Sequence, residues 1–257
     1  MDLDYFIKML IDKVSIAIER LKTFEPLDGY YLAFSGGKDS QVIYKLMEMS
    51  GCKFDAHYNL TTVDPPEIIR FMQNKYPTVI FDRPKRTMWQ LIPDKLMPPT
   101  RIARYCCEEL KEHGGERRTV VTGVRAAESI RRRSWQMFQP CKRRHGHILN
   151  PIIDWDETDV WDFIRKEIGY WCELYDRGYN RIGCIGCPNS PDQKRQLEDN
   201  LKIKKSYLLA FERMLALRKE RNLKTTWATG QEVMDWWLAN DKGVKIDENQ
   251  KQFIFEP

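Results

Sequence analysis

The stretch Ser35-Gly36-Gly37-Lys38-Asp39-Ser40 decides the fold, because an apolar run from Tyr30 to Phe34 precedes it and a helix-like run from Gln41 to Met49 follows it. This order predicts a strand, a tight turn and a helix start. Two glycines let the turn present its backbone N–H groups, Lys38 adds a positive charge, and a helix N-terminus attracts anions. The stretch predicts a phosphate-binding loop, and the alternative is a glycine-rich turn without a ligand.

The order of residues in this loop excludes one common phosphate-binding motif. A Walker P-loop places four residues between its first glycine and its Gly-Lys pair, and this chain has none there. SGGKDS instead resembles the PP-loop of the ATP pyrophosphatase superfamily. The resemblance implies ATP or an adenylyl ester as the ligand, with pyrophosphate as a frequent leaving group.

Composition narrows the class of protein. A chain of 257 residues predicts one main domain plus a small lobe. Lys and Arg number 42 against 37 Asp and Glu, and this mild excess suits small anionic ligands without demanding nucleic acid. An acidic start and the lack of a long apolar run predict a soluble, cytoplasmic protein with no membrane partner. Oligomeric state does not follow from these features.

Strands alternate with helices along the first two thirds of the chain, which predicts an α/β fold with a doubly wound, mainly parallel five-stranded sheet. The expected strands are 30–34, 53–60, 78–82, 118–123 and 148–153. The expected helices are 3–22, 41–49, 66–75, 101–113 and 157–166, with residues 84–100 irregular. Helices at 192–222 and 230–238 predict a C-terminal helical lobe. The expected domains are an N-terminal helix (1–28), a nucleotide-binding domain (29–170) and a cysteine-loop and helical lobe (171–257).

Two groups of charged residues follow strand ends, where open α/β sheets bind ligands. Asp64 and Glu67 follow the second strand, and capping of the next helix explains them equally well. After Gly123, a helix beginning near Arg125 would place Arg125, Glu128 and Arg132 on one face, suited to a phosphate or sulfate. The basic stretch 141–145 predicts a second anion contact or a nucleic-acid patch.

Seven cysteines in a chain of this size predict reduced thiols or metal ligands. Cys184 and Cys187 have the spacing of a metal knuckle, and the other close pair is Cys106 and Cys107. Adjacent cysteines suit different irons of one cluster better than a single zinc ion, so the pattern favours a four-iron, four-sulfur cluster over zinc. A redox disulfide at the CxxC and four unrelated buried thiols are the alternatives.

Together the CC pair, the CxxC, SGGKDS and the arginine-rich strand end resemble the adenylyl-sulfate and phosphoadenylyl-sulfate reductase family, in its cluster-bearing branch, over residues 30–188. The resemblance implies a fold similar to the adenine nucleotide α-hydrolases. It implies nucleotide binding by Ser35, Gly36, Gly37, Lys38, Asp39, Ser40, Asp64, Gly123, Arg125 and Glu128. It implies catalytic roles for Lys38, Asp39, Arg125 and Arg132, and cluster ligation by Cys106, Cys107, Cys184 and Cys187.

The chain departs from the family in its tail. The reductases carry a nucleophilic cysteine in a C-terminal Glu-Cys-Gly motif, and residues 245–257 contain no cysteine. Reduction of an activated sulfate needs such a thiolate. Cys141, beside three basic residues, is the candidate substitute, although Cys52, Cys141 and Cys172 are each expected to be ordinary thiols.

Three functions remain open. The first is adenylyl activation of an acceptor at the α-phosphate of ATP, or sulfur transfer, with Mg²⁺ bridging phosphates and Asp39 on the metal side, as in sulfurtransferases that modify nucleic acids. The second is a reductase that forms sulfite from adenylyl sulfate or its 3′-phosphorylated form with electrons from thioredoxin. The third is a non-catalytic nucleotide-binding module with a structural four-cysteine site. The sulfur donor and the acceptor are undefined.

Overall fold

A computed structural model describes residues 3–141 and 143–239, with side chains from residue 13 onward. The described residues form two compact units that interleave along the chain. The first unit contains the chain up to Asn59 together with Pro66–Asp82 and His113–Ile182. The second unit contains Leu60–Pro65, Arg83–Glu112 and the described residues from Gly183 onward. The three consecutive domains expected from the sequence stay a prediction.

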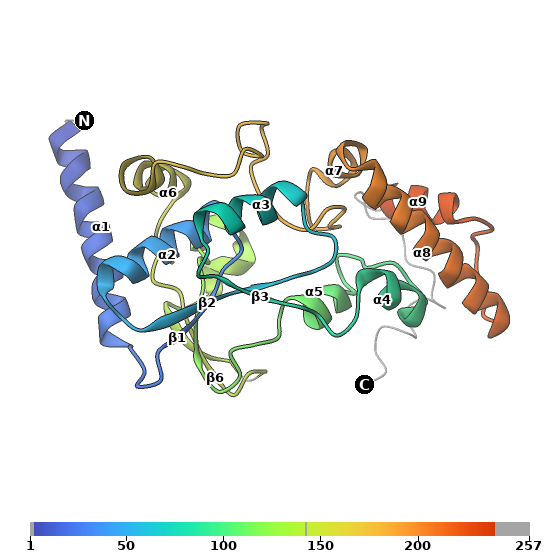
Figure 1. Ribbon diagram of the computed structural model, residues 1–257, viewed down its shortest axis with the longest axis horizontal. Helices are drawn as coiled ribbons and strands as arrows, with labels where there is room; N and C mark the ends of the chain where they lie inside the picture. Colours follow the sequence, from blue (N-terminus) through green and yellow to red (C-terminus); the bar gives the residue numbers. More distant parts are fainter. Residues whose placement is uncertain (1–2, 142, 240–257) are drawn as a thin grey trace. The chain divides into compact units, whose positions relative to one another are not determined.

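The first unit is built on a six-stranded sheet in the order β3-β2-β1-β4-β6-β5; Figure 1 labels β1, β2, β3 and β6. Its strands are β1 (Tyr30–Ala33), β2 (Phe54–Asn59), β3 (Ile80–Asp82), β4 (Thr119–Val121), β5 (Phe138–Cys141) and β6 (Gly146–Leu149). All neighbouring strands pair in parallel except β5 and β6. The predicted doubly wound, mainly parallel sheet is therefore confirmed.

The prediction of five strands was wrong, because β5 adds an antiparallel edge strand. β5 contains Gln139 and Pro140 and lacks the apolar run by which the other strands are recognised. Proline is tolerated there because an edge strand needs hydrogen bonds on only one side. The strand expected at 148–153 is displaced to Gly146–Leu149, and turns follow it.

Helices of the first unit place the loop of interest at the carboxyl end of β1. They are α1 (Leu3–Thr23), α2 (Lys38–Ser50), α3 (Pro66–Lys75) and α6 (Glu157–Phe163), which continues into one π-type turn, η3 (Ile164–Ile168). α2 packs against α1 and α6. The buried Tyr30 hydroxyl donates to the Leu21 carbonyl at 2.7 Å and ties β1 to α1. The sheet thus presents α2 from a rigid, buried support.

The second unit is helical and has its own core. It contains α4 (Met88–Lys95), α5 (Tyr105–Leu110), α7 (Gln193–Asp199), α8 (Leu201–Glu220) and α9 (Gly230–Ala239). α8 packs against α4 and α9 (Figure 1). The core of this unit contains buried Phe211, Val233 and Trp237. Three expectations need correction: residues 84–100 contain α4, the helix expected at 101–113 is shorter, and a break at Asn200 divides the helix expected at 192–222.

None of the helices within the described ranges combines the length and the apolar character that a membrane span requires.

A charged network joins β2, β3 and the chain entering β4. Arg118 donates to both carboxylate oxygens of Asp55, at 2.8 and 2.5 Å. The His57 ring bridges Asp55 and Asp82 through its two nitrogens, at 2.6 and 2.7 Å. Hydrogen bonds from Arg118 hold the pKa of the Asp55 carboxyl below its ordinary value. The network therefore stabilises the folded sheet with a contribution that depends on pH.

Replacing Asp55 with Asn should lower the free energy of unfolding at neutral pH by about 1 kcal/mol, because a paired charge in a partly exposed site is lost. The folded-state pKa of Asp55 lies below its unfolded value, so its contribution is present above the unfolded pKa and is lost as the pH falls through the folded pKa. Urea unfolding at neutral and acid pH measures this. Asp28→Asn, at an exposed carboxylate 3.9 Å from Arg118, is the matched control. A deficit independent of pH would contradict the assignment.

Candidate functional site

The loop between β1 and α2 takes, at Gly36, a left-handed backbone conformation that favours glycine. Gly36 has φ +69°, and a Cβ atom there would lie 2.8 Å from the Met72 side chain. Gly37 precedes the first turn of α2, and its carbonyl accepts the Gln41 amide at 3.0 Å. The positive end of α2 therefore opens at the carboxyl end of β1, where parallel sheets bind ligands.

Side chains of the loop brace it from within. The Ser40 hydroxyl accepts the Ser35 amide at 3.2 Å and donates to the Gly37 carbonyl at 2.8 Å. The buried Gln41 side chain donates to the Gly36 carbonyl at 3.0 Å. Ser40 is buried and Ser35 is exposed. Ser40 is thus a scaffold residue, and Ser35 is the serine that solvent reaches.

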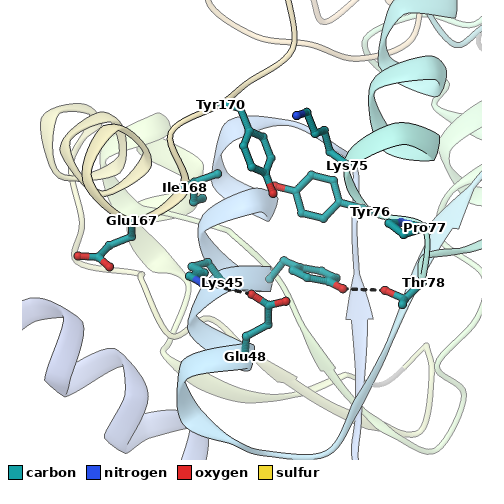
Figure 2. Close-up of a pocket in the computed structure, with 10 residues that line it drawn as sticks. Lys45, Glu48, Lys75, Tyr76, Pro77, Thr78, Glu167, Ile168 and Tyr170 are labelled. Atoms are coloured by element: carbon teal, nitrogen blue, oxygen red, sulfur yellow. Dashed lines mark hydrogen bonds and ion pairs between the residues drawn. The ribbon is translucent and has the colours of Figure 1, made fainter.

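A hollow of about 350 Å³ lies beside α2, lined in part by Tyr44, Tyr76 and Tyr170 (Figure 2). Its lining contains no residue of the stretch Ser35–Ser40. Tyr76 nevertheless reaches the loop, because its hydroxyl donates to the Gln41 side chain at 3.2 Å, and Gln41 in turn holds the Gly36 carbonyl. The hollow is therefore separate from the loop, and Tyr76 in its wall supports the loop through Gln41.

Two cations and two carboxylates form an ion-pair cluster at the N-terminus of α2. Arg125 is 2% exposed and donates to Asp39 at 2.7 Å and to Glu157 at 2.8 Å. The Lys38 ammonium lies 3.3 Å from Glu157 and 3.7 Å from Asp39. The two cations are therefore held beside the loop amides, with their charge balanced by Asp39 and Glu157.

Glu157 was not among the residues predicted to form the site. It lies at the first position of α6, and the sequence suggested only a helix start there. Asp156 is the cap of that helix and accepts the Asp159 amide at 2.9 Å. The sequence signal that could have pointed to Glu157 as a site residue is its position after a strand and the turn that follows it.

The segment after β4 that carries Arg125, Glu128 and Arg132 differs from the helix expected there. Residues Ala126–Glu128 (η1) and Ile130–Ser134 (η2) form two short 3-10 turns, separated at Ser129. Arg125 precedes the first turn and faces α2, whereas Arg132 forms an ion pair with Glu128. The prediction of one helical face was wrong, because the ladder of an α-helix does not form through Ser129.

Gly123 lies against the first turn of α2. A Cβ atom at Gly123 would lie 2.9 Å from the Asp39 backbone carbonyl carbon and oxygen. Backbone does not give way as a flexible side chain does, so the glycine allows the end of β4 to approach α2. Gly123 therefore has a structural role beside the loop, because its lack of a side chain lets the two segments approach each other.

Tyr175 and Asn180 also reach the loop, and sequence reasoning missed both. The Lys38 amide donates to the Tyr175 hydroxyl at 2.8 Å, and the Lys38 ammonium donates to the Asn180 carbonyl at 3.0 Å. Burial raises the pKa of the Tyr175 hydroxyl above its ordinary value. Both residues come from the glycine-punctuated segment before the CxxC, and no spacing rule linked that segment to Lys38.

Asp64 belongs to the second unit, whereas the loop belongs to the first. Its carboxylate accepts the Thr61 amide at 2.7 Å and the Thr61 hydroxyl at 2.6 Å, which closes the turn after β2. The Cys184 thiol donates to the same Thr61 hydroxyl at 3.5 Å. Within the second unit, Asp64 thus lies with the cysteines, and Glu67 of the first unit pairs with Arg177 at 3.2 Å.

Both cysteine pairs lie in the second unit. Cys106 and Cys107 open α5, and Cys184 and Cys187 lie in one turn, closed by the Cys187 amide to the Cys184 carbonyl at 3.3 Å. All four are free thiols. The Ile185 amide donates to the Val63 carbonyl at 2.8 Å and anchors this turn to the segment that carries Asp64.

Cations and neighbouring thiols tune the acidity of these cysteines. A hydrogen bond from Cys106 and a second from Arg104, at 3.4 Å, lower the pKa of the Cys107 thiol. The hydrogen bond with Cys107, burial and the charges of the other cysteines raise the pKa of Cys106. Burial raises the pKa of Cys184, while the Lys111 charge opposes the rise. The four thiols are therefore close enough to affect one another.

The donor set fits a metal in kind. Thiolate is the form that binds a thiophilic metal such as iron or zinc, and the lowered pKa of Cys107, beside Arg104, favours that form. Within the ranges that the structure describes, no group of three or more His, Cys, Asp or Glu side chains is arranged to hold a metal ion. The cysteines supply the right ligands, and the predicted cluster stays a prediction.

Comparison with known proteins points to one family. Residues 29–190 match the model of the phosphoadenosine phosphosulfate reductase domain. The chain is 32% identical to an uncharacterized protein of Methanocaldococcus jannaschii, with 61% of this chain and 40% of that protein covered. It is 28% identical to the "Probable FAD synthase" of Schizosaccharomyces pombe, with 68% of each covered. It is 34% identical to the adenosine 5′-phosphosulfate reductase of Allochromatium vinosum, with 32% of this chain and 34% of that protein covered.

Solved structures share the fold. The phosphoadenylyl-sulfate reductase of Candida auris, in a phosphate complex, aligns with a TM-score of 0.50 and 17% identity over 72% of this chain and 96% of that chain. The FMN adenylyltransferase of Candida glabrata, in complex with FAD and pyrophosphate, aligns with a TM-score of 0.51 and 17% identity over 72% of this chain and 67% of that chain.

Replacing Glu157 with Gln should lower the free energy of unfolding by about 1–2 kcal/mol, because buried Arg125 keeps only one anionic partner. The expected loss of stability is smaller than for a fully buried pair, since the Glu157 side chain is 54% exposed. Asp162→Asn is the matched control in the same helix, because Asp162 pairs with the exposed Arg165 and should contribute little. Equal effects of the two substitutions in chemical denaturation would contradict the structural role of Glu157.

Proposed function

Because this chain belongs to the phosphoadenosine phosphosulfate reductase domain family, we propose that it is an enzyme that binds an adenine nucleotide on Ser35–Ser40 and carries out adenylyl activation or sulfur transfer. One observation carries the proposal: Lys38 and Arg125 share Asp39 and Glu157 at the N-terminus of α2. Helix amides, an ammonium and a guanidinium at one point suit an oligophosphate.

In the proposed reaction, a nucleophile on the acceptor attacks the α-phosphorus of ATP. The bond from that phosphorus to the bridging oxygen of the β-phosphate breaks, and pyrophosphate leaves with the electron pair. Lys38 and the amides at the start of α2 would stabilise the charge on the departing pyrophosphate. As phosphates enter, Arg125 would exchange carboxylate contacts for phosphate oxygens. The loop therefore contributes orientation and charge stabilisation.

The proposal includes Mg²⁺. Asp39 and Glu157 are the carboxylates beside the loop that would hold the ion, and when bound it would supply charge neutralisation for the phosphates. Ser35, Gly36, Gly37, Ser40, Gly123 and Glu128 are proposed to shape the nucleotide site, and Arg132 to contribute through Glu128.

A four-iron, four-sulfur cluster is proposed for the second unit. Cys106, Cys107, Cys184 and Cys187 would hold it, and when bound it supplies electron-transfer or sulfur-carrying chemistry. Arg104 and Lys111 would balance the thiolate charge. Asp64 lies in the same unit and is proposed to support the Cys184 turn through Thr61, and its nucleotide contact expected from the sequence remains part of the proposal.

The relatives favour two versions of the reaction. The "Probable FAD synthase" of Schizosaccharomyces pombe supports adenylyl chemistry, and the adenosine 5′-phosphosulfate reductases support sulfite formation with a thioredoxin-like reductant. Sulfite formation needs a nucleophilic thiolate beyond the four cluster cysteines. Cys52 and Cys172 are buried, and Cys141 is partly exposed in β5. Adenylyl activation is therefore the first candidate, and reduction through Cys141 is the second.

Replacing Lys38 with Ala should reduce pyrophosphate release from ATP by roughly 100-fold, because the charge that stabilises the leaving group is lost. In the assay, wild-type protein that contains the proposed cluster is mixed with ATP, a sulfur donor and candidate acceptors that include tRNA and DNA. Lys45→Ala is the matched control, because Lys45 lies in the same helix and pairs with Glu48. Pyrophosphate release that is absent from wild type, or unaffected in K38A, would contradict the proposal.

Anaerobic purification should yield brown protein with iron and acid-labile sulfide, and Cys184→Ser should lose both. Cys141→Ser is the control and should keep them, because Cys141 lies outside the proposed ligand set. Colourless wild-type protein with zinc, or without metal, would remove the cluster from the proposal. Sulfite formed from adenylyl sulfate with thioredoxin, and abolished by C141S, would favour the reductase.

A further inference from the structure

One short segment supplies oxygen atoms to two donors of the phosphate loop. The Tyr175 hydroxyl accepts the Lys38 amide at 2.8 Å, and the Asn180 carbonyl accepts the Lys38 ammonium at 3.0 Å. The Lys38 amide is the first amide of α2, and such amides bind phosphate oxygens at helix N-termini. The protein's own oxygens therefore occupy the donors that an incoming phosphate needs.

We propose that the segment Cys172–Asn180 is an internal occupant of the phosphate site, and that an incoming nucleotide must displace the Tyr175 hydroxyl from the Lys38 amide. The inference rests on the proposed function, because it assumes that the loop binds an oligophosphate. It assigns to Tyr175 a part in setting how tightly that ligand binds.

Packing aims the Tyr175 hydroxyl at the loop. Its ring meets the Trp161 ring edge-on, with centroids 5.1 Å apart, and the Trp161 indole donates to Glu157 at 3.1 Å. The Lys38 ammonium lies 5.7 Å from the Tyr175 ring centroid. Burial keeps the hydroxyl protonated, so its oxygen is neutral. A neutral oxygen accepts a weaker hydrogen bond than a phosphoryl oxygen, so a phosphate can replace it.

The turn that carries Tyr175 is held in part by exposed ion pairs. Arg177 pairs with Glu67 at 3.2 Å and with Glu173 at 2.9 Å, and the Arg177 side chain is 52% exposed. Exposed pairs of this kind contribute little stability. Gly178 has φ +82° and closes a turn through its amide to the Tyr175 carbonyl at 3.0 Å. Buried Leu174 and Tyr179 flank this turn, so movement can be confined to the residues between them.

An internal occupant lowers the apparent affinity of the loop by the fraction of molecules in which the site is free. Removing the Tyr175 hydroxyl while keeping its ring should raise that fraction. The sign of the effect distinguishes this role from a direct ligand role, in which loss of the hydroxyl would weaken binding.

The test is calorimetric titration of the full chain with inorganic pyrophosphate. Tyr175→Phe should bind pyrophosphate roughly two- to tenfold more tightly than wild type, because one competing hydrogen bond is lost. Tyr44→Phe is the matched control: its hydroxyl lies in the same unit, bonds to Thr78 at 2.7 Å, and should leave the affinity unchanged.

Equal or weaker pyrophosphate binding by Y175F would overturn the inference and leave the proposed nucleotide site standing. Failure of wild type and Y175F alike to bind either pyrophosphate or ATP would overturn the proposed function, and the inference with it.

Hydrogen exchange of the wild-type chain gives a second answer that does not require the variant to fold. ATP should speed amide exchange in the peptide covering residues 172–182, because the segment leaves the loop. Slower exchange in that peptide on ATP binding would show that the segment stays in place and would overturn the inference.

Discussion

The guanidinium of Arg125 is the constraint on which the candidate site depends. It joins Asp39 at the start of α2 to Glu157 at the start of α6, and it lies directly after β4. A buried arginine is costly without anionic partners, so the three segments must meet in this arrangement. Gly123 allows the approach, because any side chain there would meet the Asp39 backbone. The loop amides are therefore fixed in direction before a ligand arrives.

Local pattern was sufficient to predict the frame of the first unit. The apolar run before Ser35, the glycines and the helical run after them gave β1, the loop and α2, and Pro66 marked the start of α3. Edge strand β5 was missed because Gln139 and Pro140 interrupt its apolar character. Spacing alone could not separate one helix from the two short turns that surround Ser129.

The parts of the site that were missed are contacts between residues distant in sequence. Glu157, Tyr175 and Asn180 reach Lys38 across more than a hundred residues, and each has an ordinary local explanation. Asp64 follows β2 directly, as the sequence indicated, and it is grouped with the unit that contains the cysteines. Its nucleotide contact stays a prediction.

The central claim is that the amides and cations around Ser35–Ser40 hold the phosphates of an adenine nucleotide. A crystal structure of the chain grown with Mg²⁺ and a non-hydrolysable ATP analogue tests it most directly. The account predicts phosphate oxygens on the amides from Gly37 to Ser40, with Lys38 turned from Glu157 toward the phosphates. An analogue bound elsewhere, with the contacts of Lys38 and Arg125 to Asp39 and Glu157 unchanged, would contradict it.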